Sequence, residues 1–221
     1  MRLPDYCSQC MKREIKISID SVALPGTLSV PEAASGIVVC AHGSGSSRFS
    51  PRNVFVAEEL QKGGIATLLI DLLTEKEDEV YETRFNIDLL TERLEAVVTW
   101  IEKEPETRSL PTGLFGASTG AASALRVAAR LGERIKAVVS RGGRPDLAMD
   151  ELGAVRAPTL LIVGGNDLGV IELNEQALAA LNCEKKLEIV SGATHLFEEP
   201  SALEEVALLA SDWFRAHFSA K

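Results

Sequence analysis

Ser118 lies at the centre of the segment 116–120, whose sequence is Gly-Ala-Ser-Thr-Gly. The apolar pair 114–115 precedes this segment and the small residues of 121–124 follow it, a pattern that predicts a strand, a sharp turn and a helix. Glycines suit such a turn because larger side chains there would collide with the neighbouring backbone. The serine hydroxyl would then project from the edge of a sheet as a nucleophile; the alternative interpretation is a glycine-rich turn whose serine does no chemistry.

A serine hydroxyl is a weak nucleophile at neutral pH, so it needs a base and an acid that orients the base. His195 follows the apolar run 187–190, and Asp167 follows the apolar run 159–163. Both residues come after Ser118 in the order Ser, Asp, His. The sequence therefore predicts a catalytic triad of these three residues. The alternatives left open are His42 as the base and Asp71 or Asp146 as the acid.

Acyl transfer also needs at least two preorganised hydrogen-bond donors for the oxyanion that develops in the transition state. The residue after the nucleophile supplies one backbone N–H in such a turn, and here that residue is Thr119. The segment 42–45, His-Gly-Ser-Gly, follows the apolar run 37–41 and would lie at the same edge of the sheet. The second predicted donor is therefore the backbone N–H of Ser44.

Four arginines follow the oxyanion loop or a later predicted strand, which puts them on or near the catalytic edge. A guanidinium matches a carboxylate or a phosphate through its planar fork of N–H donors. We expect one or two of these arginines to bind such a group on the substrate, and salt bridges to an acidic rim are the alternative. The four are Arg48, Arg52, Arg141 and Arg144.

Short apolar runs recur along the chain with room for a helix between neighbours, which is typical of strands covered on both faces. They are residues 37–41, 65–70, 113–115, 135–139, 159–163 and 187–190. Apolar residues at helical spacing mark segments 87–101 and 203–213. The alternation predicts an α/β fold, with a mostly parallel, doubly wound sheet of about eight strands and helices on both faces.

The first part of the chain predicts an antiparallel hairpin at the edge of this sheet. Residues 14–20 alternate apolar and polar side chains, and residues 26–30 follow Pro25, so a proline turn would join the two strands. Between Val139 and Thr159 there is no insertion of the length that forms a lid. A short, soluble ester therefore suits the site better than aggregated lipid.

Composition limits the classes to which the chain can belong. With 221 residues and 46% hydrophobic content it can bury a full core, so we expect a single domain over residues 1–221, with residues 1–11 as an N-terminal extension. The formal net charge of −9 argues against a nucleic acid or an anionic membrane as partner. No apolar run has the length of a signal-peptide core or a membrane span, which predicts a cytoplasmic protein.

The cysteines do not predict a metal site. Cys7 and Cys10 are spaced like half of a metal or redox motif, but no second pair follows them. Cys40 lies inside an apolar run and Cys183 stands alone. We therefore expect neither a metal nor a cofactor.

With these motifs together, the chain resembles the dienelactone hydrolase-like group of α/β-hydrolases. The resemblance runs from the predicted hairpin to segment 193–197, and it implies an α/β-hydrolase fold with Ser118, Asp167 and His195 as nucleophile, acid and base. Enzymes named for dienelactone hydrolysis carry cysteine where this chain has Ser118, so their enol-lactone substrate is not carried over. Serine versions are similar to general carboxylesterases, and related chains occur as domains fused to phosphoribosyltransferases.

The expected function is hydrolysis of a small carboxylic ester, lactone or thioester through an acyl-enzyme on Ser118, without a cofactor. Acyl transfer to another acceptor by the same triad is one alternative. A non-catalytic module that binds a small ligand through its arginines is another. The sequence predicts a small-molecule partner and does not predict an oligomeric state.

Overall fold

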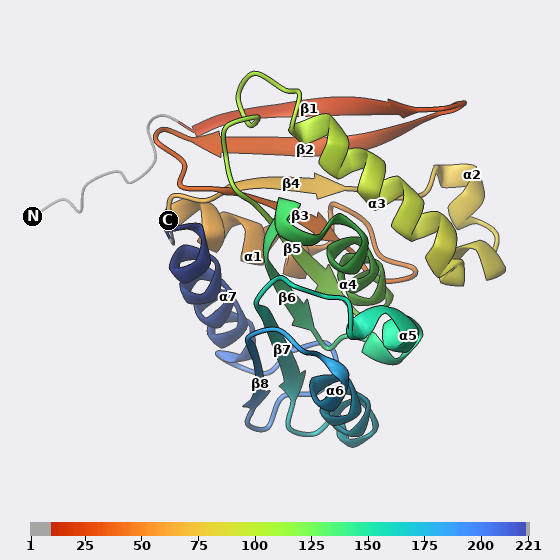
Figure 1. Ribbon diagram of the computed structural model, residues 1–221, viewed down its shortest axis with the longest axis vertical. Helices are drawn as coiled ribbons and strands as arrows, with labels where there is room; N and C mark the ends of the chain where they lie inside the picture. Colours follow the sequence, from red (N-terminus) through yellow and green to blue (C-terminus); the bar gives the residue numbers. More distant parts are fainter. Residues whose placement is uncertain (1–9, 220–221) are drawn as a thin grey trace, which may run out of the picture.

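The computed structural model describes residues 10–219, which form an eight-stranded sheet between two layers of helices (Figure 1). The strands in chain order are β1 (Cys10–Ile19), β2 (Val22–Pro31), β3 (Ile37–Ala41), β4 (Ala66–Ile70), β5 (Thr112–Ala117), β6 (Ile135–Arg141), β7 (Thr159–Gly164) and β8 (Lys185–Val190). The α-helices are α1 (Pro51–Lys62), α2 (Glu75–Asp78), α3 (Ile87–Ile101), α4 (Thr119–Leu131), α5 (Met149–Leu152), α6 (Leu168–Ala180) and α7 (Ala202–Phe218). Short 3₁₀ helices are η1 (Glu82–Phe85), η2 (Gly132–Arg134) and η3 (Pro145–Ala148).

The strand order is β1-β2-β4-β3-β5-β6-β7-β8. The pairs from β4 through β8 are parallel, while β1 pairs with β2 and β2 with β4 in the antiparallel sense. The prediction of a mostly parallel, doubly wound sheet with an antiparallel hairpin at one edge is confirmed. Because β5 to β8 are consecutive neighbours, the loops after their carboxyl ends lie side by side.

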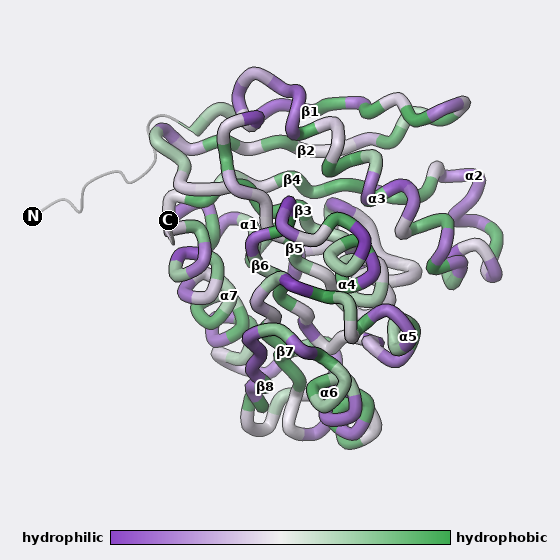
Figure 2. The backbone as a smooth tube through the Cα atoms, in the orientation of Figure 1, coloured by the Kyte–Doolittle hydropathy of each residue, from purple (hydrophilic) through white to green (hydrophobic). Residues whose placement is uncertain are grey.

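The central strands are apolar because helices cover both of their faces. Every residue of β3, β4, β5 and β7 is buried, whereas β8 at the sheet edge is partly exposed. Figure 2 shows hydrophobic residues along the central strands and mixed hydropathy along the surrounding helices. This arrangement explains why the central strands have continuous apolar runs rather than alternating patterns.

Two hydrophobic cores lie on opposite faces of the sheet. Helices α1 and α7 pack together on one face, where Leu60 and Phe214 are fully buried beside Val139 of β6. Helices α3, α4 and α6 cover the other face, where Leu94 and Leu125 are fully buried. The helical spacing seen in the sequence thus corresponds to the apolar face that each of α3 and α7 turns to the sheet.

The hairpin differs from its prediction in the position of its turn. The two strands meet at Asp20, whose φ is +48°, and not at a proline turn. Pro25 lies inside β2 opposite Lys16, and β2 does not begin to pair with β4 until Gly26. Pro25 has no backbone N–H to donate, and this is tolerated because the residue lies at the end of the β2–β4 ladder.

Two more features bear on the predicted domain boundaries and lid. Cys10 and Met11, expected in the N-terminal extension, belong to β1 instead, because they pair with β2. Residues 142–158 carry only η3 and α5, in agreement with the absence of a long lid there. Of the helices within residues 10–219, none combines the length and the apolar character needed to cross a membrane.

Candidate active site

Ser118 occupies a strained turn between β5 and α4. Its φ of +50° and ψ of −121° fall in a region that non-glycine residues rarely adopt, at a general cost of order 1–3 kcal/mol. The serine is the N-cap residue of α4, yet its hydroxyl makes no capping hydrogen bond. The strain is thus combined with a side-chain oxygen that the helix does not use.

The glycines on either side of this turn are required by space. A Cβ at Gly116 would come 2.4 Å from the Cα of Ala121, and a Cβ at Gly120 would come 2.4 Å from the carbonyl oxygen of Ala41. Real Cβ atoms do not approach backbone so closely. Both glycines therefore allow α4 to pack directly against the ends of β5 and β3.

His195 and Asp167 meet at the ends of β8 and β7. The Nδ1 atom of His195 lies 2.7 Å from Oδ2 of Asp167. Asn166 clamps the two loops together: its backbone N–H donates to Ala193 O at 2.9 Å, and its side chain donates to Gly192 O at 2.8 Å. Because Asp167 holds Nδ1, Nε2 is the ring nitrogen that is left to accept a proton.

The end of β6 joins the serine turn to the histidine loop. The backbone N–H of Ser118 donates to Arg141 O at 3.2 Å. The next residue, Gly142, lies against His195, since a Cβ built on this glycine would be 3.5 Å from Cε1 of the imidazole. Two consecutive residues thus touch the predicted nucleophile on one side and the predicted base on the other.

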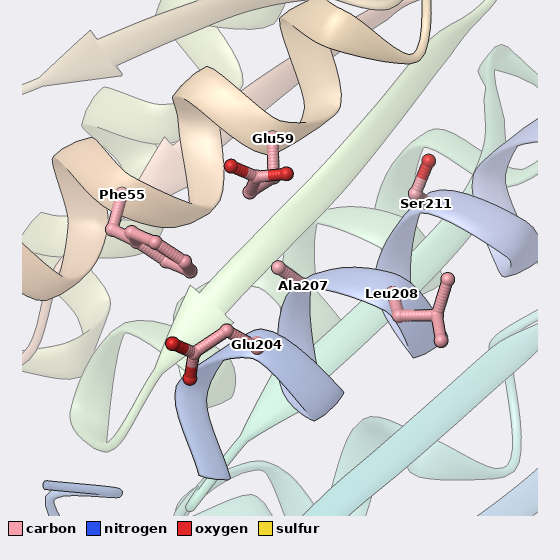
Figure 3. A pocket seen from close by; sticks show the side chains of 6 residues that line it. All are labelled: Phe55, Glu59, Glu204, Ala207, Leu208 and Ser211. Carbon is pink, nitrogen blue, oxygen red and sulfur yellow. The ribbon is translucent and has the colours of Figure 1, made fainter. Parts of the chain in front are cut away.

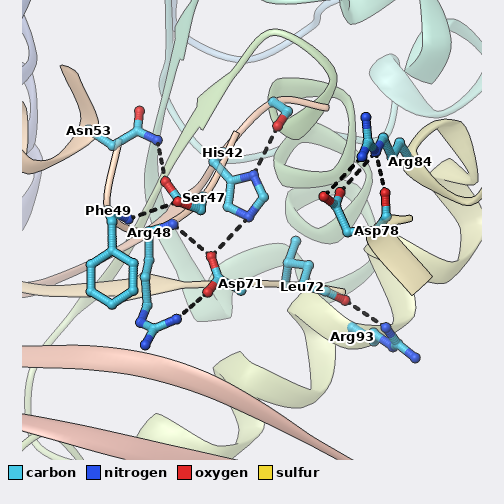
Figure 4. Close-up of polar contacts among 11 residues, drawn as sticks. His42, Ser47, Arg48, Phe49, Asn53, Asp71, Leu72, Asp78, Arg84 and Arg93 are labelled. Atoms are coloured by element: carbon cyan, nitrogen blue, oxygen red, sulfur yellow. Dashed lines mark hydrogen bonds and ion pairs between the residues drawn. The ribbon is translucent and has the colours of Figure 1, made fainter. Parts of the chain in front are cut away.

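His42, the alternative base, has both ring nitrogens facing other acceptors (Figure 4). Nδ1 lies 2.9 Å from the carbonyl oxygen of Gly43, and Nε2 lies 3.3 Å from Oδ1 of Asp71. Asp71 also accepts the backbone N–H of Arg48 at 2.6 Å and binds its guanidinium. The pair of His42 and Asp71 therefore holds the loop after β3 in place.

The charge of Asp71 suits this structural role. Burial raises the pKa of its carboxyl group, but hydrogen bonds from His42 and Arg48 outweigh burial, and the net pKa is lower than usual. The carboxylate is thus ionised at neutral pH and can hold two donors of the loop.

The loop after β3 also contacts the serine turn directly. A Cβ at Gly43 would lie 2.9 Å from Cβ of Ser118. The backbone N–H of Ser44, predicted as an oxyanion donor, donates to Oγ1 of Thr119 at 2.9 Å. A substrate oxygen would have to replace the Thr119 hydroxyl as the acceptor of this N–H, so the assignment of Ser44 and Thr119 to an oxyanion hole stays a prediction.

Arg48 and Arg144, two of the four candidate arginines, pair with aspartates. Arg48 binds Asp71 in the network just described. Arg144 makes two parallel hydrogen bonds to Asp146, at 2.8 and 2.7 Å, and they raise the pKa of its guanidinium. Asp146, an alternative acid in the sequence analysis, is thereby engaged with an arginine rather than with a histidine.

The other two candidates lie together on the α1 and α7 side of the sheet. Arg52, in the first turn of α1, donates to Glu198 at 2.9 Å. The guanidinium of Arg141 has no hydrogen-bond or carboxylate partner within residues 10–219, and its Nε and Nη1 atoms are shut off from solvent. Burial, together with the charge of Arg52, lowers the pKa of Arg141 to about 10.

The segment between β4 and α3 borders the site. Arg93 of α3 donates to Leu72 O at 2.8 Å and binds Glu77 of α2 with both terminal nitrogens, at 2.8 and 2.6 Å. Figure 4 shows Arg84 bound to Asp78 in the same segment, and Arg84 Nη1 lies 3.7 Å from a Cβ built on Gly45. The capping box of Thr74 and Glu77 is the sequence signal that could have predicted a helix here.

A groove between α1 and α7 lies outside this region (Figure 3). Its lining residues are Phe55, Glu59, Glu204, Ala207, Leu208 and Ser211. None of the predicted site residues lines it, so we do not assign it to the candidate active site.

The described residues offer no metal site. No group of three or more His, Cys, Asp and Glu side chains between residues 10 and 219 could hold an ion. Burial raises the pKa of the Cys40 thiol to about 12, which keeps it protonated and unreactive. Cys7 lies outside the described residues, so its predicted lack of a role is not tested.

Comparison with solved structures identifies the fold. The protein Est1E from Butyrivibrio proteoclasticus superposes with a TM-score of 0.81 at 18% identity, covering 94% of this chain and 99% of that chain. A dienelactone hydrolase from Anabaena variabilis is 54% identical, with a TM-score of 0.92 over 95% of this chain and 99% of its own. The strand order and these superpositions define the α/β-hydrolase fold.

Sequence comparison then gives the family. The model described as the dienelactone hydrolase family matches residues 25–219, so this chain belongs to the dienelactone hydrolase family of hydrolases. A curated Mycobacterium tuberculosis protein, which bears the provisional name of a phosphoribosyl transferase, is 56% identical over 204 residues. The match covers 92% of this chain but 46% of the relative, so the chain spans about half of that protein's length.

Proposed function

We propose that this chain is a serine hydrolase that cleaves a small carboxylic ester, lactone or thioester through an acyl-enzyme on Ser118. The contact of 2.7 Å between His195 and Asp167, on the loops beside the strained serine turn, carries the proposal. The 54% identical Anabaena protein is named a dienelactone hydrolase, which supports hydrolysis as the reaction class. We do not carry the phosphoribosyl transferase name over to this chain, because the chain covers only 46% of the relative that bears it. The Ser118 turn instead suits attack on a carbonyl carbon.

In the proposed mechanism, Ser118 Oγ attacks the carbonyl carbon of the substrate while Nε2 of His195 takes the hydroxyl proton. Asp167 holds the imidazole through Nδ1 and stabilises the imidazolium. The C–O or C–S bond to the leaving group then breaks, and His195 returns the proton to that group. Water, activated by the same nitrogen, releases the acyl group as a carboxylic acid.

The oxyanion would form beside the start of α4. The predicted donors are the backbone N–H groups of Thr119 and Ser44, the second after it exchanges the Thr119 hydroxyl for the substrate oxygen. The amino end of α4 adds partial positive charge at the same place. We propose a small molecule as the partner, and a cytoplasmic location stays a prediction.

Labelling with a fluorophosphonate probe, followed by intact mass measurement, tests this function. Wild type should gain one adduct, and Ser118→Ala should gain none while losing ester turnover by at least about 10⁴-fold. Ser109→Ala, an exposed serine before β5, is the matched control and should label like wild type. An unlabelled wild type with a native far-UV spectrum would refute the proposal and favour a binding module.

Product analysis separates hydrolysis from acyl transfer. With an alcohol or amine acceptor present, a hydrolase gives mainly the free acid, whereas an acyltransferase gives mainly the new ester or amide. The Ser118 acyl-enzyme is common to both reactions, so this measurement decides only the acceptor.

A further inference from the structure

The last strand of the sheet, β8, forms an open edge. It lies at the opposite end of the sheet from the hairpin of β1 and β2, and within residues 10–219 it pairs with β7 alone (Figure 1). Lys185 and Lys186 are exposed along this strand, and Ile189 is 42% exposed. An open edge presents unpaired N–H and C=O groups to which another strand can add.

The pairing with β7 decides which backbone groups of β8 point outward. The N–H of Thr159 donates to Glu184 O at 2.8 Å, and the N–H of Gly165 donates to Val190 O at 2.8 Å. Hydrogen bonds are evenly spaced along a parallel pair, so alternate residues from Glu184 onward turn their backbone groups to β7. The N–H and C=O groups of the residues in between therefore face outward. These residues are Lys185, Leu187 and Ile189.

The charges on β8 are complementary to a second copy of the same strand. Lys186 and Glu188 both lie on the α7 face of the sheet, where they pair with each other at 2.5 Å. An antiparallel two-fold pairing centred on Leu187 would place Lys186 of each copy opposite Glu188 of the other. Centring the pairing on Lys186 or on Glu188 would instead place like charges opposite each other, which is destabilising. Lysines usually keep an edge strand from pairing, but this strand also carries the complementary charge.

The same register also satisfies the outward backbone groups. It places Lys185 opposite Ile189 of the other copy and Leu187 opposite itself, so residues with outward N–H and C=O groups meet one another. The Nζ atom of Lys185 donates to Leu181 O at the end of α6, at 2.6 Å. Because its charge is engaged there, the alkyl stem of Lys185 is left to contact the exposed Ile189.

A hollow beside β8 adds apolar surface to this edge. It has a volume of about 330 Å³ and lies between the strand and α7. Its walls include Leu160, Leu209 and Trp213, together with Lys186 and Glu188. The charged side chains that pair across the two-fold axis would project over this hollow. The second copy would therefore shield part of its apolar wall from water.

We propose that β8 is the contact surface for a second copy of this chain, and that two copies join their sheets through antiparallel β8 strands centred on Leu187. This inference goes beyond the proposed function and does not depend on it. The charge pattern favours a second copy over a different protein, because the strand is its own complement. The assembly is a closed dimer, since the two-fold axis uses the β8 edge of both copies.

The dependence of molecular mass on protein concentration tests the contact. Sedimentation equilibrium of wild type should give a reversible equilibrium between monomer and dimer. Lys186→Glu brings a glutamate opposite Glu188 in both halves of the interface, so it should raise the Kd of the dimer by roughly 10-fold or more. The double variant Lys186→Glu/Glu188→Lys restores opposite charges, and its Kd should return to within about threefold of wild type.

Two further variants separate this interface from general effects of charge and folding. Lys136→Glu makes the same change of net charge at an exposed position of β6 and should leave the Kd unchanged. Ile189→Pro removes an outward N–H without removing a donor to β7, because proline is tolerated where an edge strand faces solvent. It should prevent dimerisation while the far-UV circular dichroism spectrum stays native.

Amide hydrogen exchange, measured by NMR at low and high protein concentration, locates the contact. The amides of Leu187 and Ile189 should exchange slowly only at high concentration, whereas those of Lys186 and Glu188 face β7 and should be protected at both. A wild type that stays monomeric up to about 1 mM would overturn the proposal. So would a dimer whose Kd does not respond to Lys186→Glu, or an assembly that grows beyond two copies.

Discussion

Asp167 is the residue on which the proposed triad depends most clearly, because it selects one histidine over another. Within residues 10–219 two histidines pair with aspartates, and the pairs differ in which ring nitrogens are engaged. His195 contacts Asp167 through Nδ1, whereas both nitrogens of His42 face acceptors. The first arrangement leaves Nε2 of His195 available to act as a base, whereas the second holds the loop after β3 in place.

Replacing each acid in turn tests this distinction. Asp167→Asn should lower kcat by about 10³- to 10⁴-fold, because the amide favours the wrong imidazole tautomer while the fold is retained. Asp146→Asn should change kcat by only a few-fold, since that carboxylate pairs with Arg144. Steady-state kinetics on one ester, with circular dichroism to verify folding, gives both values. A larger loss in Asp146→Asn than in Asp167→Asn would reverse the assignment of the acid.

At the scale of elements, the serine turn requires α4 to lie against the ends of two strands. Gly120 provides the closest approach, because the position of its missing Cβ is 2.4 Å from Ala41 O and 2.5 Å from His42 O. Both obstacles are backbone atoms, which cannot rotate away as a side chain can. The position of the helix is therefore tied to the loop that carries Ser44.

Gly120→Ala should destabilise the protein by about 1–3 kcal/mol and reduce probe labelling of Ser118, because α4 must shift away from β3. Gly169→Ala is the matched control, since a Cβ in that first turn of α6 meets nothing within 4 Å. It should be neutral or slightly stabilising. Urea unfolding measures both; wild-type stability in Gly120→Ala would show that the contact yields without strain.

The segment that borders the site is fastened by Glu77. Hydrogen bonds from Arg93 lower the pKa of this carboxyl group to about 2 from a usual 4.5. Since the folded pKa lies below the unfolded one, the stabilisation is complete above pH 4.5 and is lost as the pH falls toward 2. The ionised form of Glu77 thus contributes to the stability of α2 at neutral pH.

Glu77→Gln should reduce the free energy of unfolding at pH 7 by about 1.5–3 kcal/mol, toward the lower end because the carboxylate is partly exposed. The difference from wild type should shrink steadily between pH 5 and pH 2, because the wild-type carboxylate protonates there. Urea unfolding across that range measures it. A difference that stays constant with pH would mean that the charge of Glu77 does not contribute.

At the scale of the whole molecule, Arg141 places an uncompensated charge against the core on the α1 and α7 side. Arg141→Met should therefore raise the free energy of unfolding by about 1–4 kcal/mol in the absence of ligand, because it exchanges a desolvated charge for a side chain of similar length. Thermal or urea unfolding gives the value. Destabilisation by this change would mean that the charge is neutralised within the fold.

The comparison with relatives also belongs to this scale. The chain covers 99% of the Anabaena structure but 46% of the Mycobacterium tuberculosis relative. The same unit thus matches a whole chain in one case and about half of a chain in the other. The Ser118 site lies within the unit that this chain shares with both relatives. The rest of the Mycobacterium tuberculosis protein lies outside that unit.

The sequence by itself determined the strands, the serine turn and the order of Ser118, Asp167 and His195 along the chain. These features are local: apolar runs mark buried strands, glycines mark a turn without room for side chains, and parallel strands bring their carboxyl ends to one edge. The hairpin turn was misplaced because a proline signals a turn and also fits the end of a ladder.

Only the tertiary structure decided the partners of the charged side chains. Arg48, Arg52, Arg141 and Arg144 look equivalent in the sequence, yet three have a carboxylate partner and Arg141 has none in the described chain. The long side chain of Arg52 reaches Glu198, which is 146 residues away in the chain. Such pairings depend on which distant loops meet and how much water they exclude, and no local pattern of residue types records either quantity.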